Sequence, residues 1–567
     1  MQRHGDATRR SSLGLLARIA LGAVLLVAAG ALLMPTPQQP SAAPEPLRTI
    51  PYTDVNPYGG NFFLDREAET WKVEKTLEMA REAGLGWVKQ LLPWEALEVR
   101  RGVFRHEATN RSTWERYDEI VAMAERRGLE VIFRVDRPPA WARGQRPNPP
   151  DGQHPPASLE DFGNYVAAVA QHYRGRVRFY QVWNEPNLAR EWGNQPPDAA
   201  AYTALLRTAY RRIKAVDPSA VVLNAPLAQT YERSARAVPD VAFLEDMYAA
   251  GAKDAFDIFF ANGYGLEFAP EDPPDASRLN FRRVLLLRRI MERHGDGQKP
   301  VWFNEFGWNA APASFPPERL TWRRVGEEQQ AEYTVRAIQQ ARAEWPWAGV
   351  FNIWFFRQDG HIPPNDAQYY FRMVDVGFTP RVVFYHVRDA ARQVRIAGPG
   401  DYQESNPALQ AGAGWRSRDE ERASGGRVLV SDTIGAELRV AFEGGGIALR
   451  VRGDQASGIA YIAVDGQPAP ELPQDDRGRS YLDLYRDAPG DERLLAASGL
   501  GAGRHELRLT VAGQRNVAAQ GNAIRVDGFD VLPPSSPTAG QIGASVALGA
   551  LALLVVLWVV VRRSPTP

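Results

Sequence analysis

The sequence contains no cysteine, and it is poor in histidine and in net charge. With no cysteine among 567 residues, structural disulfides, thiolate catalysis and cysteine-based zinc sites are excluded. The 8 histidines show no H-E-x-x-H or other metal spacing, so we expect no metal and no cofactor. The 67 basic and 67 acidic side chains cancel, so the chain has no overall field that would recruit nucleic acid. A neutral or locally recognised ligand is therefore expected.

Aromatic side chains, by contrast, are abundant. The chain carries 15 Trp, 19 Tyr and 23 Phe. Tryptophan is costly to leave exposed unless its ring stacks on a partner. The faces of sugar rings are one such partner, so the composition fits a carbohydrate ligand.

An uncharged run of 16 residues, Ile19 to Met34, stands near the N-terminus. Four arginines precede it, and a Pro-rich linker over 35–56 follows it. This order is typical of a signal anchor or a signal peptide over 1–34. Both stay open, because no clean A-x-A site follows Met34, although the Ser-Ala-Ala at 41–43 is a candidate for cleavage.

A second uncharged run covers 20 residues from Ile542 to Val561, and Arg562 and Arg563 follow it at once. Its length and composition predict a transmembrane helix over 542–561. The arginines beside both runs lie on the side away from the rest of the chain. The positive-inside rule then predicts a protein of the cell membrane, held by its terminal helices, with residues 49–535 on the extracytoplasmic side.

Between Pro57 and Phe355, short β-branched or aromatic runs alternate with helical patterns, which predicts βα units and a parallel sheet. Eight such units are the size of a closed (β/α)8 TIM barrel, which we place at 57–396. An open doubly wound sheet is the alternative, but no G-x-G-x-x-G fingerprint follows any strand. The expected strands are 60–64, 87–92, 130–135, 179–184, 220–225, 256–262, 301–305 and 349–355.

After the barrel, apolar and polar residues alternate, with Gly-rich turns between the runs. The clearest runs are 436–442, 447–452, 459–465 and 506–511. They predict an antiparallel β-sandwich of jelly-roll type over 410–533. This region resembles the galactose-binding-like sandwiches of carbohydrate enzymes, and both a carbohydrate-binding role and a packing or spacer role stay open. The predicted fold class is thus α/β, a barrel followed by a β-sandwich, flanked by terminal transmembrane segments.

Two glutamates stand at the ends of predicted barrel strands. The fourth strand reads Y-Q-V-W-N-E-P and places Glu185 at its end, while the seventh reads V-W-F-N-E-F-G and places Glu305 at its end. In such barrels the active site forms where the strands end and the βα loops begin. The fourth and seventh of eight strands face one another across the mouth of the barrel, so the two carboxyls can converge.

Two carboxyls supply what cleavage of a glycosidic bond needs, a proton donor for the leaving oxygen and a nucleophile or base on the other side of the sugar. A separation of about 5 to 5.5 Å lets the second carboxylate attack directly and retains configuration, whereas about 6.5 to 9.5 Å admits a water and inverts it. One carboxyl must stay protonated near neutral pH, which burial and a neighbouring negative charge achieve by raising its pKa.

The two motifs also carry a family resemblance. W-N-E-P around Glu185 resembles the acid/base motif of clan A glycoside hydrolases, and N-E-F-G-W around Glu305 resembles their nucleophile strand. Family 39, which includes β-xylosidases and α-L-iduronidases, is the most similar, and the cellulase-containing family 5 is next. The resemblance spans about residues 57–395. It implies a retaining enzyme in which Glu185 is the acid/base, Glu305 is the nucleophile and Asn184 donates to the sugar 2-hydroxyl.

The same resemblance suggests further site residues. Tyr264, after the sixth strand, matches the tyrosine that hydrogen-bonds the nucleophile, while Asn262 stands where the clan usually has histidine. Trp354 on the eighth strand matches the aromatic floor under the reacting sugar. Arg134 and Asp136, on and after the third strand, lie where sugar hydroxyls can be read.

The expected function is retaining hydrolysis of O-glycosidic bonds in a polysaccharide or glycoconjugate, with the catalytic domain outside the cytoplasm. Transglycosylation that remodels a surface glycan uses the same residues and stays open. A catalytically inactive barrel that binds glycan also stays open. The sequence fixes neither the sugar and linkage nor the oligomeric state.

Overall fold

The computed structural model describes residues 48–149, 152–501 and 503–534. The segments predicted at 1–34 and 542–561 lie outside these ranges, as does most of the Pro-rich linker over 35–56. Within the described ranges, every helix is too short or too polar to serve as a membrane span.

Eight parallel strands form the first sheet, in the order β5-β4-β3-β2-β1-β8-β7-β6. Consecutive strands pair except β5 and β6, the two ends of this order, and β8 pairs with β1, as in a (β/α)8 barrel. The predicted barrel is therefore confirmed. Its strands are β1 (Tyr58–Phe62), β2 (Trp87–Pro93), β3 (Glu130–Asp136), β4 (Phe179–Val182), β5 (Val221–Leu223), β6 (Phe259–Tyr264), β7 (Val301–Gly307) and β8 (Ala348–Ile353).

The seam between β5 and β6 closes through a few backbone hydrogen bonds and through side chains. A single parallel bridge joins Leu223 to Ile258. The amide of Phe260 donates to Asn224 Oδ1 at 2.8 Å, and the amide of Val222 donates to Asp257 Oδ2 at 2.8 Å. Two polar side chains thus take the place of part of a strand ladder.

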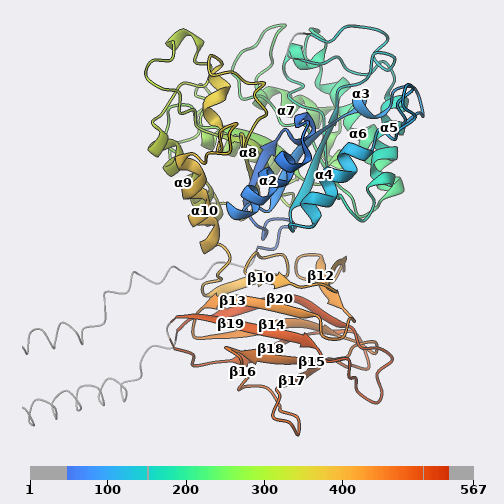
Figure 1. Cartoon of the computed structure of the whole chain (residues 1–567), viewed down its shortest axis with the longest axis vertical. Coiled ribbons are helices and arrows are strands. Elements are labelled where there is room, and N and C mark those ends of the chain that lie inside the picture. The colour runs from blue at the N-terminus through green and yellow to red at the C-terminus, as the bar shows by residue number, and fades with distance from the viewer. Residues whose placement is uncertain (1–47, 150–151, 502, 535–567) are drawn as a thin grey trace, which may run out of the picture. The chain divides into compact units, whose positions relative to one another are not determined.

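Helices follow the strands and pack outside the sheet (Figure 1). The first, α2, buries Val73, Leu77 and Ala80 on one stripe. It ends before Gly84, whose φ of +77° suits glycine and whose position leaves no room for a Cβ beside Ala391. The helices are α2 (Thr70–Glu82), α3 (Trp94–Leu97), α4 (Glu115–Glu125), α5 (Leu159–His172), α6 (Ala199–Val216), α7 (Asp240–Ala249), α8 (Val284–Arg293), α9 (Glu327–Glu344) and α10 (Val382–Gln393), with 3-10 turns η1 (Leu64–Arg66), η2 (Ala189–Trp192), η3 (Ala252–Ala255), η4 (Phe281–Arg283), η5 (Pro317–Arg319) and η6 (Ala367–Phe371).

Several strand ends differ from the prediction. The fourth strand was expected to run through Asn184, but β4 ends at Val182. The chain turns there because Trp183 and Glu185 have positive φ angles of 76° and 39°, which no strand residue adopts. The fifth strand is shorter than expected at both ends, and β6 begins and ends later than predicted.

The second region forms two antiparallel sheets, as the predicted β-sandwich requires. One sheet has the order β10-β13-β19-β15-β16 with β17 on β15, and the other has β11-β12-β20-β14-β18 with β9 on β20. Its strands are β9 (Gly400–Gln403), β10 (Leu409–Ala411), β11 (Arg416–Asp419), β12 (Arg427–Ser431), β13 (Glu437–Glu443), β14 (Gly446–Gly453), β15 (Ile459–Val464), β16 (Gln467–Pro468), β17 (Tyr481–Asp483), β18 (Gly490–Ala497), β19 (Arg504–Val511) and β20 (Ile524–Leu532).

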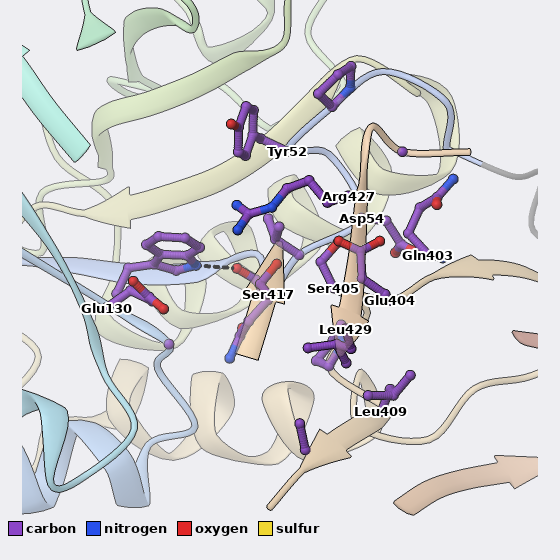
Figure 2. Close-up of a pocket in the computed structure, with 18 of the residues that line it drawn as sticks. Tyr52, Asp54, Glu130, Gln403, Glu404, Ser405, Leu409, Ser417, Arg427 and Leu429 are labelled. Atoms are coloured by element: carbon purple, nitrogen blue, oxygen red, sulfur yellow. Dashed lines mark hydrogen bonds between the residues drawn. The ribbon is translucent and has the colours of Figure 1, made fainter. Parts of the chain in front are cut away.

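A cavity of about 520 Å³ lies at the amino ends of the barrel strands, where Trp87 and Glu130 begin β2 and β3 (Figure 2). Glu404 and Arg427 also line it. Burial raises the pKa of Glu404 to about 8. Because barrel enzymes place their chemistry at the opposite, carboxyl ends of the strands, this cavity is not the candidate active site.

Candidate active site

A second cavity, of about 550 Å³, opens at the carboxyl ends of the barrel strands. Glu185 and Glu305 both line it, as the sequence predicts for a shared site. Asn184, Tyr264, Trp354 and Arg134 line it as well, whereas Asp136 and Asn262 do not. Side chains from distant parts of the sequence therefore meet at the mouth expected for an active site.

Glu185 stands just after β4, in a loop that turns it toward the cavity. Its left-handed backbone is held by its own amide, which donates to the carbonyl of Pro226 at 3.1 Å. Oε1 accepts a hydrogen bond from Asn262 Nδ2 at 2.8 Å, and Oε2 lies 3.3 Å from Arg190 Nη2. Burial raises the pKa of Glu185 to about 7, helped by the charge of Glu305 and opposed by Arg190.

Glu305 lies on β7 beside an extra residue in the ladder. The pairing of β6 with β7 shifts so that Ala261 faces Phe303 and Asn262 faces Glu305, which leaves Asn304 as a bulge. A bulge re-aims the side chains that flank it. Here Asn304 and Glu305 both turn inward: Asn304 Nδ2 donates to Asn262 Oδ1 at 2.9 Å, while Glu305 Oε2 accepts from the Tyr264 hydroxyl.

Two donors hold the Glu305 carboxylate. The Tyr264 hydroxyl donates to Oε2 at 2.8 Å, and the ammonium of Lys89 lies 3.5 Å from Oε1. Burial and the nearby charge of Glu305 raise the pKa of Tyr264 well above its usual value, so its hydroxyl stays protonated as a donor. Lys89 also donates to Asn61 Oδ1 at 2.8 Å. Glu305 is thus placed to accept from two donors, and Glu185 is a carboxyl whose pKa is raised to about 7.

Asn262 links the two halves of the site. Its Nδ2 donates to Glu185, while its Oδ1 accepts from Asn304, which fixes the orientation of the amide. A histidine at this position would titrate, whereas an amide does not. Asn262 therefore gives Glu185 a hydrogen-bond donor that does not ionise.

Two buried polar atoms in the wall of the cavity lack a hydrogen-bond partner among the described residues. They are the amide oxygen of Asn184 and the indole Nε1 of Trp354. Buried polar groups are usually satisfied, so a bound ligand with hydroxyl groups would complete both. Trp354 is half-buried and packs edge-on against Phe63, whose ring also lines the cavity.

Arg134 and Asp136 form an ion pair in the wall, with Nε 2.5 Å from Oδ2. The carboxylate of Asp136 also accepts a hydrogen bond from Gln153 at 3.0 Å, and the residue is fully buried. Arg134 therefore reaches the cavity, and Asp136 lies behind it as its counter-ion. A direct contact between Asp136 and a sugar, which the sequence suggested, is not available in this arrangement.

The residues of the site that were not singled out from the sequence include Lys89, Arg190 and Trp322. A signal for Lys89 was present, because a lysine within the predicted strand 87–92 must find a partner if the strand is buried. Arg190 lies on η2 after β4, and Trp322 lies in the segment between β7 and α9; the direction of both side chains depends on tertiary structure.

An eight-stranded parallel barrel with two carboxyls at the carboxyl ends of its fourth and seventh strands defines the structural class of the molecule. No family model matches the chain, and no curated protein matches it. Solved structures do match, and several belong to glycoside hydrolase family 39, the family that the two glutamate motifs resemble.

Three of these solved structures illustrate the similarity. A family 39 glycoside hydrolase from Bacteroides cellulosilyticus WH2 is 17% identical, with a TM-score of 0.46, over 82% of each chain. A monomeric β-xylosidase from Caulobacter crescentus CB15 is 15% identical, with a TM-score of 0.44, over 83% of this chain and 98% of the other. A glucosidase from Croceicoccus marinus is 12% identical, with a TM-score of 0.46, over the same shares.

Proposed function

We propose that the chain is a retaining glycoside hydrolase that cleaves O-glycosidic bonds by double displacement. The observation that carries the proposal is the pair of carboxyls on one cavity. Burial raises the pKa of Glu185 to about 7, whereas the carboxylate of Glu305 is bound by a hydroxyl and an ammonium. Pairs of titratable groups in such different surroundings mark the acid and the nucleophile of a glycosidase.

The proposed reaction has two steps. Glu305 attacks the anomeric carbon while Glu185 gives its proton to the leaving oxygen, which forms a glycosyl ester on Glu305. Esterification removes the negative charge of Glu305, and that charge contributes to the raised pKa of Glu185. Glu185 can then act as the base that activates the incoming water.

The test is turnover of a panel of activated aryl glycosides by the full chain in mild detergent. Glu305→Ala should abolish hydrolysis of every substrate that the parent cleaves. Glu185→Ala should slow it strongly, and azide should restore turnover by forming a glycosyl azide of retained configuration. Azide needs no base, so it replaces the water that Glu185 would activate.

The alternative outcomes separate the candidates. A product of inverted configuration would contradict double displacement, and cleavage that survives loss of both glutamates would contradict the assignment of the site. Sugar acceptors that compete with water for the intermediate would identify a transglycosylase. Parent chain that binds glycans but cleaves no member of the panel would point to a binding barrel.

We also propose that the terminal apolar segments anchor the chain in the cell membrane, with the barrel on the extracytoplasmic side. The support is the sequence: the apolar run over 542–561 and the arginines that flank both runs away from the barrel. A substrate in a polysaccharide or glycoconjugate outside the cytoplasm fits this placement.

A further inference from the structure

A buried lysine stands beside the proposed nucleophile. Lys89 comes from the middle of β2, its side chain is 4% exposed, and its ammonium lies 3.5 Å from Glu305 Oε1. The same ammonium donates to Asn61 Oδ1 at 2.8 Å. A buried charge is costly unless a partner compensates it, so Lys89 and Glu305 depend on each other.

The charges around this pair come from several strands. Burial lowers the pKa of Lys89 to about 8, and Glu305 opposes the shift by favouring the ammonium. From β3, Arg134 opposes the charge of Lys89, and Asp136 favours it. β1 contributes the neutral Asn61. The groups that face Glu305 from other elements are Tyr264 on β6, Glu185 after β4 and Arg190 on η2.

Lys89 is the cation placed to compensate Glu305. Arg134 is committed to Asp136 at 2.5 Å, and Arg190 contacts Glu185. Without Lys89, a nucleophile that is 7% exposed would keep the neutral Tyr264 hydroxyl as its one side-chain hydrogen-bond donor among the described residues. A carboxyl in that position would take up a proton more readily, and a protonated carboxyl cannot attack.

We propose that Lys89 is a positioning residue whose ammonium holds the buried carboxyl of Glu305 in the ionised, oriented state that attack requires. The kinetic part of this inference rests on the proposed function, because it assigns Glu305 the role of nucleophile. The electrostatic part does not, because coupling between two titrating groups is reciprocal and can be read from either partner.

The first experiment reads the coupling from the lysine. The chain has only six lysines, so NMR of full-length protein labelled with ¹³C at lysine Cε gives a small set of side-chain signals. The signal that Lys89→Met removes belongs to Lys89. It should titrate near pH 8 in the parent and at lower pH in Glu305→Gln, because the variant loses the charge that favours the ammonium. Equal titration in both proteins would overturn the proposal.

The second experiment reads the coupling from the reaction. The substrate is the dinitrophenyl glycoside of the sugar that the parent cleaves best, because this leaving group needs no proton from Glu185. The acid limb of kcat/KM then reports ionisation of the nucleophile in the free enzyme. Lys89→Met should move this limb to higher pH, and so lower kcat/KM relative to the plateau on the acid side of the profile.

Lys89→Arg is the matched control, since it keeps the charge. The acid limb of its kcat/KM profile should lie at the same pH as in the parent, even if the plateau value of kcat/KM falls. A merely structural role would lower the plateau of both variants and leave both limbs in place, which would overturn the proposal. If the NMR coupling is present while no glycoside is cleaved in a Glu305-dependent way, the proposed function fails and the electrostatic role of Lys89 stands.

Discussion

Glu185 is costly to ionise in the folded chain. Burial raises the pKa of its carboxyl from 4.5 to about 7. The contribution of protonated Glu185 to the free energy of unfolding is fully present below pH 4.5. It is lost as the pH rises through 7, by about 3 kcal/mol in total. Glu185→Gln removes this loss, so it should melt above the parent at pH 8, and the gap should narrow as the pH falls to 4.5. Thermal scans across this range, with Glu78→Gln on the exposed face of α2 as control, measure it.

Tyr264 donates to the other carboxylate. Its hydroxyl lies 2.8 Å from Glu305 Oε2, and a hydrogen bond to a charged group is worth about 1.5–3 kcal/mol. Tyr264→Phe should therefore lower kcat/KM by about 10- to 150-fold. The control is Tyr231→Phe, at a tyrosine that is 63% exposed. Unchanged kcat/KM in Tyr264→Phe would show that this hydrogen bond is not used in the reaction.

At the scale of single elements, β8 depends on the glycine at its second position. A Cβ built on Gly349 would lie 2.1 Å from Trp302 Nε1, which donates to the carbonyl of Tyr52 at 2.8 Å. Gly349→Ala must displace this buried indole and break its hydrogen bond, at a cost of about 1–3 kcal/mol or more. The melting temperature should fall clearly. Gly377→Ala, where a Cβ meets nothing within 4 Å, should leave it nearly unchanged.

The elements also show what a sequence pattern can and cannot predict. Apolar runs and helical stripes predicted the barrel, because burial enforces those periods, and the W-N-E-P and N-E-F-G motifs predicted Glu185 and Glu305. The bulge at Asn304 was not predicted, since it depends on the register between two strands. The contact of Lys89 with Glu305 was missed because it joins β2 to β7, two strands that do not pair, across the interior of the barrel.

For the whole molecule, the absence of cysteine provides a test of membrane topology. A single cysteine can be introduced without background, for example by Val517→Cys at a fully exposed position or by Ser564→Cys after the predicted C-terminal helix. On spheroplasts, a membrane-impermeant maleimide should label Val517→Cys at once and Ser564→Cys only after permeabilisation. The reverse pattern would place the barrel in the cytoplasm, and labelling of both on intact spheroplasts would contradict a C-terminal span.

The seam between β5 and β6 has a consequence for local opening of the barrel. With a single bridge at the seam, the ring is expected to open first there, as the least protected part of a fold does. The hydrogen bond from Asn262 to Glu185 reaches across this gap, from β6 to the loop after β4. A sugar that binds Glu185 would therefore stabilise the closed form of the seam, and the seam would open least often while substrate is bound.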